Sequence, residues 1–315
     1  MGCNKAKRSF VTVSVAAAIL AGCSYPGGKS GPVPALQEPA SAKTATSDAL
    51  VYTGSNVYDL VSGQQVGQLS GFDPHFTPEG LCTDEAGDIF VSGMLVRSAA
   101  VYGSDVYRFA HGAFTPEAMV SETGAAIGCA VDPTTGNLAV SNIASYQNFS
   151  GSVAVFNQAK GQPAYYMSPK HRALAYCTYD GKGNLYVTED DGALIEMPKG
   201  STSFKPVNVS NGAFVRSLQW YAGRLILSGF VPHRQGTPVY LYRASVGNGI
   251  ATVEQTTTLS NKGNFPSWEQ FYVDGTHVVG SGHRGDKLLE WTYPAGGLPA
   301  TVLSTTQYFG VVISK

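Results

Sequence analysis

The sequence predicts an all-β protein: a six-bladed β-propeller of four-stranded blades, closed by the C-terminal strand joining the first blade. Three observations lead to this prediction. A short motif recurs along the chain at a regular spacing, turn-forming residues are dense, and helical periodicity is absent. The chain has 315 residues, of which 43% are hydrophobic, 14% are charged and 37 are Gly. This composition suits a large core with many tight turns.

The recurring motif is a turn with glycine, then alternating apolar residues, then a small residue. Copies of the motif occupy residues 87–92, 136–141, 183–188, 223–228 and 275–280, and residues 50–53 form a sixth copy that lacks its turn. The closing small residues are about 45 residues apart, which is the period of a four-stranded blade. We expect each copy to be the second strand of a blade.

Further apolar segments surround these copies. Residues 80–84, 127–132 and 175–180 each precede a strong copy, and we expect them to be innermost strands. The first copy lacks such a segment, whereas 308–313 resembles an innermost strand with nothing after it. The C-terminal segment is therefore expected to complete the first blade, which removes an open sheet edge.

The N-terminal segment has the features of an export signal. Lys5, Lys7 and Arg8 precede an apolar stretch at 10–20, and Leu20-Ala21-Gly22-Cys23 resembles the lipobox of bacterial lipoproteins. We expect a signal peptide at 1–22, a lipidated Cys23 with a flexible tether at 23–48, and the propeller at 49–315. The composition of the tether is typical of disorder. The resemblance implies outer-membrane sorting in a Gram-negative cell, because Ser24 stands where an aspartate would retain the protein. The alternative is an ordinary secretory signal with an incidental cysteine.

The turn-Gly-x-Leu-Tyr-Val-Thr pattern, clearest at 183–188, is similar to the NHL, YncE-like and SMP-30/gluconolactonase-like propellers. This resemblance implies the fold, whereas it says little about activity because the motif encodes blade packing. For SMP-30-like lactonases it implies a divalent metal such as Ca²⁺, held by Glu, Asn and Asp at the ends of inner strands.

Glu79 takes the first of these metal-ligand positions. The later positions fall on Ala126 or Ile127, Leu174 or Ala175, Arg216, and Trp268 or Glu269, and most of these residues are not metal ligands. We therefore expect no cofactor and no lactonase activity. A calcium site at Glu79 is the alternative.

The predicted strands sort the connections into two rims. The turn rim carries tight connections between the first and second and between the third and fourth strands of a blade, such as 180–183, 198–200 and 295–297. The loop rim carries the other connections, at 93–105, 142–151, 229–237 and 260–267, which we expect to be longer. Long loops on one face of a rigid scaffold are where binding usually occurs.

His, Arg, Asn and aromatic residues map to the loop rim. The candidate ligand-binding residues are His75, Arg97, Asn142, Tyr146, His171, Arg172, Arg216, His233, Arg234, Trp268, Glu269, His283 and Arg284. Tyr102 maps to the same rim. Arg supplies paired donors and aromatic rings supply stacking surfaces, so the set suits an anionic or sugar-like ligand. The alternative is that these are solvated loop residues.

We expect a non-enzymatic, envelope-anchored binding protein for a small ligand, a glycan or a protein partner. One alternative is a hydrolase or lactonase with a degenerate site, with His171, His233 and Glu269 as acid–base groups. Another is a scaffold that uses the sides of the propeller. A net charge of −1 without a basic stripe argues against nucleic-acid binding. We expect a monomer held at the membrane by its lipid anchor.

Three cysteines, Cys82, Cys129 and Cys177, remain after removal of the signal and lipidation of Cys23. They take the same position in consecutive inner strands, where later blades have Gln219 and Gln270. We expect these positions to lie farther apart than the limit of about 7 Å between the Cα atoms of a disulfide. This predicts three buried thiols, and a thiolate metal site near the axis is the alternative.

Overall fold

The computed structural model describes residues 48–145, 150–167, 170, 172–230, 238–260, 266–282, 287–304 and 310–315, with the backbone alone at 145, 230, 266–269, 281, 282 and 304. All of them lie within one compact unit, Ala42–Lys315. No helix among these residues has the length and apolar character needed to cross a membrane.

The described residues form 24 strands and one turn of 3-10 helix, Asn157–Ala159. The first twelve strands are β1 Leu50–Thr53, β2 Asn56–Asp59, β3 Gln65–Gln68, β4 Phe76–Thr83, β5 Ile89–Arg97, β6 Ala100–Phe109, β7 Ala118–Glu122, β8 Gly124–Val131, β9 Leu138–Ser145, β10 Ser152–Phe156, β11 Ala164–Met167 and β12 Leu174–Tyr179. The others are β13 Leu185–Glu189, β14 Leu194–Met197, β15 Lys205–Val209, β16 Phe214–Tyr221, β17 Arg224–Phe230, β18 Val239–Gly247, β19 Ile250–Leu259, β20 Pro266–Asp274, β21 His277–Gly282, β22 Lys287–Thr292, β23 Gly296–Ser304 and β24 Val311–Ser314.

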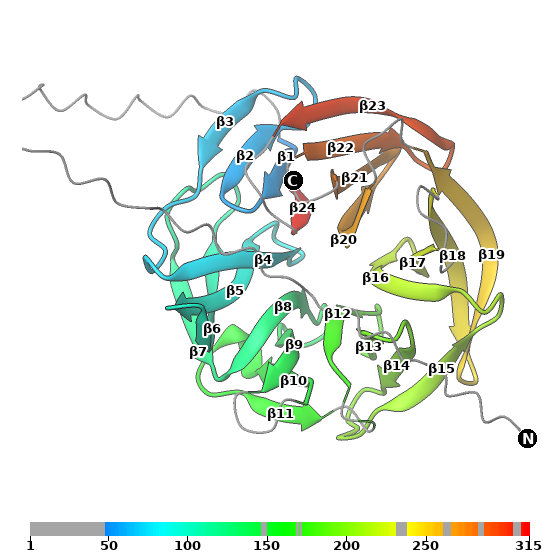
Figure 1. Cartoon of the computed structure of the whole chain (residues 1–315), viewed down its shortest axis with the longest axis horizontal. Coiled ribbons are helices and arrows are strands. Elements are labelled where there is room, and N and C mark those ends of the chain that lie inside the picture. Colours follow the sequence, from blue (N-terminus) through cyan, green and yellow to red (C-terminus); the bar gives the residue numbers. More distant parts are fainter. Residues whose placement is uncertain are drawn as a thin grey trace, which may run out of the picture. The chain divides into compact units, whose positions relative to one another are not determined.

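The strands pair in antiparallel runs of four. Three runs are separate sheets, ordered β24-β1-β2-β3, β4-β5-β6-β7 and β8-β9-β10-β11. The runs β12–β15, β16–β19 and β20–β23 join into one 12-stranded sheet through short parallel pairings of β15 with β19 and β19 with β23. Figure 1 shows the runs arranged around a centre, with β4, β8, β12, β16, β20 and β24 innermost. The all-β propeller prediction is confirmed.

The C-terminal strand closes the first sheet, as predicted. β24 pairs antiparallel with β1, and Val51 lies opposite Ile313. The strand occupies Val311–Ser314, whereas the prediction placed it at 308–313, of which 308 and 309 lie outside the described residues. The Ser314 hydroxyl also donates to the Gly87 carbonyl of the next sheet.

The hydrophobic core lies between neighbouring sheets. One cluster joins Leu50 and Tyr52 of the first sheet to Ile89, Val91 and Phe109 of the second, and none of these side chains is more than 1% exposed. Each such side chain contributes about 1.5–3 kcal/mol by its burial. Because both faces of each sheet are packed in this way, the strand residues of the motif form a continuous apolar run, such as Ile89, Phe90 and Val91.

In two copies of the motif, the small residue that closes it also links neighbouring sheets. The Ser141 hydroxyl lies 3.3 Å from the Gly128 carbonyl of its own sheet and 2.6 Å from the Ala175 carbonyl of the next. The Thr188 hydroxyl donates in the same way to the Arg216 carbonyl at 2.6 Å. A larger side chain would separate the inner strands, so the motif requires a small residue here.

Connection length does not separate the two rims as expected. The predicted loop at 93–105 is instead the β5–β6 hairpin, whose turn consists of Ser98 and Ala99 with positive φ angles of 51° and 62°. The ladder continues to the tip because 93–97 pairs with 100–105. On the turn rim, by contrast, the connections 110–117, 157–163 and 198–204 are long. We keep the two rim names for position alone.

Candidate functional site

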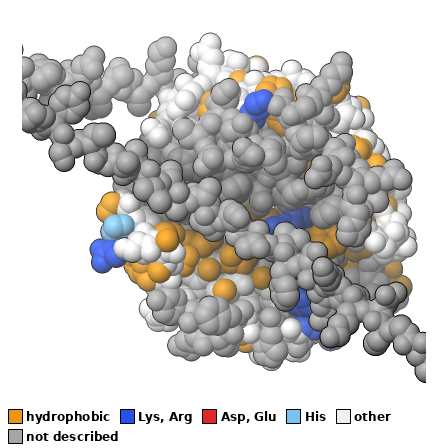
Figure 2. Space-filling view, viewed as in Figure 1, with side chains coloured by type: hydrophobic (Ala, Val, Ile, Leu, Met, Phe, Trp, Pro, Cys, Tyr) orange, Lys and Arg blue, Asp and Glu red, His pale blue; other side chains and the backbone are white. Residues whose placement is uncertain are grey.

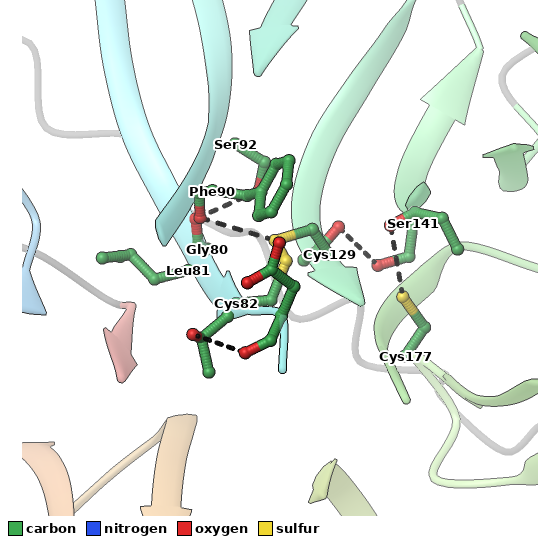
Figure 3. Close-up of a disulfide and its surroundings, with 12 residues drawn as sticks. Gly80, Leu81, Cys82, Phe90, Ser92, Cys129, Ser141 and Cys177 are labelled. Atoms are coloured by element: carbon green, nitrogen blue, oxygen red, sulfur yellow. Dashed lines mark hydrogen bonds between the residues drawn. A yellow bond between two sulfur atoms is a disulfide. The ribbon is translucent and has the colours of Figure 1, made fainter. Parts of the chain in front are cut away.

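The innermost strands approach one another more closely than expected. Cys82 of β4 and Cys129 of β8 form a disulfide with a Cα–Cα distance of 5.6 Å (Figure 3). The expectation of three free thiols is therefore wrong for this pair. The reason is Gly80, where a Cβ atom would stand 2.4 Å from the Ile127 carbonyl oxygen and 2.7 Å from the Gly128 Cα. Without a side chain at Gly80, the two backbones come within disulfide reach.

The third cysteine remains a buried thiol, as expected. Cys177 of β12 is free and lies beside Ser141, apart from the disulfide (Figure 3). Burial raises the pKa of the Cys177 thiol to about 12, and hydrogen bonds from Ser141 offset only part of that rise. The thiol therefore stays protonated and unreactive at neutral pH. Among the described residues no group of three or more His, Cys, Asp or Glu side chains is placed to hold a metal ion.

Glutamine amides link the inner strands on the other side of the axis. The Gln219 amide of β16 donates to the Val273 carbonyl of β20 at 3.0 Å and accepts from the Val273 N–H at 2.7 Å. Gln270 of β20 bonds the Leu81 N–H and carbonyl of β4 in the same two-point manner and also accepts from the Val311 N–H at 3.3 Å. These roles were not predicted, although both residues stand at the cysteine position.

The turn rim is organised by aspartates at the ends of inner strands. Asp84 Oδ1 accepts hydrogen bonds from the Ala86 and Asp88 N–H groups, each at 3.0 Å. Asp180 Oδ1 accepts from the Lys182 N–H at 2.8 Å and the Asn184 N–H at 2.9 Å. These turns fix the inner strands where they leave the axis.

A central funnel opens on this rim. It encloses about 410 Å³ and is lined by the ends of β4, β8, β12, β16 and β20, where these strands lead into their turns. A second hollow of about 350 Å³ lies beside it and shares Asp84, Glu85, Val131 and Pro133 with the funnel. The sequence-based prediction placed binding on the opposite rim and did not identify this cavity.

On the loop rim, the structure brings together His75, Arg97 and Tyr102. An Arg97 guanidinium nitrogen lies 3.2 Å from His75 Nε2, and the His75 and Tyr102 ring centres are 6.5 Å apart, edge to face. Since a guanidinium can only donate, His75 Nε2 is the acceptor in this contact. The cluster lies at the β5–β6 hairpin.

Asn142, another predicted residue, is fully buried at the junction of β7, β8 and β9. Its Nδ2 donates to Glu122 Oε2 at 3.1 Å, and the same oxygen accepts from the Gly124 N–H at 3.1 Å. Glu122 Oε1 and Asn142 Oδ1 receive no hydrogen bond within the described part of the chain. Burial raises the pKa of Glu122 to about 7, and hydrogen bonds from Gly124, Asn142 and Tyr165 offset part of the rise. A proton on Glu122 would supply a donor that this cluster lacks.

Arg172 and Arg216 differ in their surroundings. Arg172 Nε lies 3.6 Å from Asp191 Oδ2, and both side chains are well exposed. Arg216 of β16 is half-buried, and its Nε is inaccessible to solvent and has no hydrogen-bond partner among the residues that the structure describes. Ser217, the next residue, also has a buried hydroxyl without a partner among those residues.

Several predicted site residues cannot be placed. Tyr146, His171, His233, Arg234, His283 and Arg284 lie outside the described residues, and the side chains of Trp268 and Glu269 are not described. The described candidates form local groups around His75, Asn142, Arg172 and Arg216. Figure 2 shows one face of the domain with Lys, Arg, His and hydrophobic side chains in view and no described Asp or Glu.

The metal site implied by the SMP-30 resemblance does not fit these residues. Glu79 is half-buried on β4, but the corresponding residues Ala126 and Ala175 are buried and apolar. Arg216 follows on β16, and its positive charge would oppose a cation. A hard divalent cation takes six or more oxygen ligands, which these positions do not supply.

Comparisons with known proteins identify the fold. No protein-family model and no curated protein matches the chain. A protein of unknown function from Bacteroides caccae aligns with a TM-score of 0.57 and 11% identity over 85% of this chain and 98% of its own. The Cps50 (Swd1) β-propeller domain of Myceliophteria thermophila aligns with a TM-score of 0.51 and 12% identity over 81% of this chain and 82% of its own. The protein is a β-propeller; at this identity the likeness extends to fold alone.

Proposed function

We propose that the protein is an envelope lipoprotein, anchored through Cys23, whose six-bladed propeller binds an anionic ligand on its loop rim without catalysis. In this proposal residues 1–22 are a signal peptide, 23–48 are a tether and 49–315 are the propeller. The six antiparallel runs of four strands support the blade number. The motif supports kinship with the NHL, YncE-like and SMP-30-like group.

Arg216 is the observation that carries the binding proposal. A guanidinium has five donors and stays charged at any physiological pH, so burying part of it without a partner is costly. The described residues leave its Nε unsatisfied on the inner strand β16. A carboxylate or phosphate oxygen would satisfy this nitrogen and neutralise the charge. His75 and Arg97 add donors to the same rim.

The disulfide supports export. Disulfides persist in oxidising compartments such as the bacterial periplasm and are rare in the cytosol. The Cys82–Cys129 bond therefore favours a chain that folds outside the cytosol. The lipobox-like sequence ending at Cys23 supports the same route.

The binding proposal is tested by comparing an acid with its neutral counterpart. Glucuronate and glucose differ mainly in one carboxylate, so the full-length protein in detergent should prefer glucuronate in isothermal titration. Arg216→Gln should weaken glucuronate binding about tenfold or more, because a charged hydrogen-bonded contact is lost. Arg172→Gln is the matched control, since Arg172 already faces Asp191. Equal binding of the two sugars, or no effect of Arg216→Gln, would refute anion binding at this residue.

Anchoring is tested separately. Metabolic labelling with palmitate should mark the wild-type protein, and Cys23→Ser should abolish the label and release the protein from the membrane fraction. Cys177→Ser is the control, because Cys177 is buried in the propeller. Unchanged membrane association of Cys23→Ser would refute the anchor.

A further inference from the structure

The central funnel has a rigid, prebuilt wall. The Cys82–Cys129 bond fixes β4 to β8, and the Gln219 and Gln270 amides fix β16 to β20 and β20 to β4. These links hold the inner strands whether or not a ligand is present. A prebuilt cavity loses little ordering entropy when it binds a ligand. Its volume of about 410 Å³ lies within the range of small-molecule sites, roughly 300–1,000 Å³.

Aromatic side chains form part of this wall. Trp220, Tyr179 and Tyr272 line the funnel from three different strands. The Trp220 backbone N–H donates to the Thr178 hydroxyl at 3.0 Å, which holds β16 against β12. The Trp220 side chain is half-buried. Its indole Nε1 lies close to Gly181 of the funnel lining, so the ring borders the cavity, where a ligand can contact it.

The charged groups of the lining are acidic. Asp84 and Glu85 lie on the wall between the funnel and the second hollow, and the described residues that line the funnel include no Lys, Arg or His. Asp84 Oδ1 is held by two turn N–H groups, whereas no described residue donates a hydrogen bond to Oδ2. Two cations lie nearby: Lys199 donates to the Thr134 hydroxyl at 2.8 Å, and Arg108 is paired with Asp88 at 2.9 Å. Neither donates a hydrogen bond to Asp84 or Glu85, although Arg108 lines the second hollow and its charge acts on Asp84.

We propose that the central funnel is a second binding site and that it takes a small organic cation with an ammonium group. An ammonium is attracted both to the face of an aromatic ring and to a carboxylate. Trp220 would provide the ring face, and Asp84 and Glu85 would provide the carboxylates. This site lies on the turn rim and is independent of the anion site proposed around Arg216.

Choline is the probe, with glucose as the neutral control and glucuronate as the anionic one. Isothermal titration and tryptophan fluorescence of the full-length protein should detect choline binding. Trp220→Ala should weaken it about tenfold or more, in line with the loss of a desolvated cation–π contact. Asp84→Asn should weaken it as well, and Trp220→Phe should retain part of the affinity.

Two further variants keep the test decisive. Glu85 is exposed, so Glu85→Gln is expected to fold normally and still reduce choline affinity, with a smaller effect at high salt. Arg216→Gln should leave choline binding unchanged, which separates this site from the anion site. The proposal is overturned if choline, ethanolamine and putrescine all fail to bind at about 10 mM, or if glucose binds with the same dependence on Trp220.

Discussion

The β4–β8 junction and the β16–β20 junction are held together by different kinds of bond. Both must hold two inner strands together beside the central funnel. The first uses a covalent bond between Cys82 and Cys129, and the second uses the two-point hydrogen bonding of the Gln219 amide to Val273. In both junctions the link is made by the residue at the same position of the inner strand, although Cys177 at that position on β12 remains a free thiol. Only the first link depends on the redox state of the compartment.

Removing the covalent link should have the largest effect on the free energy of unfolding. Cys82→Ala with Cys129→Ala opens a loop with a sequence separation of 47, and the chain-entropy model predicts a loss of about 4 kcal/mol in the free energy of unfolding. Urea denaturation measures this. Reductant should destabilise the wild type by a similar amount and leave the double variant unchanged. A loss below about 1 kcal/mol would mean that packing alone holds this junction.

The contact between the same two sheets should also respond to pH, through Glu122 of β7, which bonds Gly124 of β8 and Asn142 of β9. Its pKa is raised from 4.5 to about 7 by burial, so its stabilising contribution is complete below pH 4.5 and is lost as pH rises through about 7. The full shift corresponds to about 3 kcal/mol. Glu122→Gln should therefore be less sensitive to pH than the wild type between pH 5 and pH 8. Parallel unfolding curves for the two proteins at both pH values would contradict this.

Breaking the amide links should cost less than breaking the disulfide. Gln270→Leu leaves the Leu81 N–H and carbonyl without their partner. We expect this to lower the free energy of unfolding by about 2–3 kcal/mol. Gln219→Leu should cost slightly less, because Gln270 also bonds the Val311 N–H. Thermal unfolding of both variants tests the order. Neither should respond to reductant differently from the wild type, since the disulfide remains intact.

Removing a hydroxyl link should lower the free energy of unfolding least. Ser141→Ala removes bonds to the Gly128 and Ala175 carbonyls but leaves room for repacking, so we expect a loss of about 1 kcal/mol. Ser62→Ala is a control on the exposed β2–β3 connection and should change stability little. A loss above about 3 kcal/mol for Ser141→Ala would place the main linkage at the hydroxyls instead.

The fold was predictable because its signal is periodic. The recurring motif, the spacing of its closing residues and the unpaired segment at 308–313 together predicted the sheets and their closure. The β5–β6 hairpin was missed because Ser98 and Ala99 adopt positive φ without Gly or Asn. Residues of this kind give no turn signal in a sequence.

The site was less predictable because it depends on distances between strands. The glycine at Gly80 signals a close approach of backbones, but which backbone approaches becomes visible only in the structure. In the same way, Gln219 and Gln270 were noticed at the cysteine position, whereas their partners lie on other sheets. Arg216 was predicted as a ligand-binding candidate, but its lack of a partner depends on what the fold places beside it.

The closure of the first sheet by β24 has a consequence for biosynthesis. β1, β2 and β3 emerge from the ribosome early, yet their inner edge stays open until Val311–Ser314 is made. The nascent chain thus exposes a strand edge throughout translation, and such edges invite aggregation or chaperone binding. The domain cannot mature sheet by sheet from its beginning. A premature stop before Val311 would leave the ring open at its first sheet.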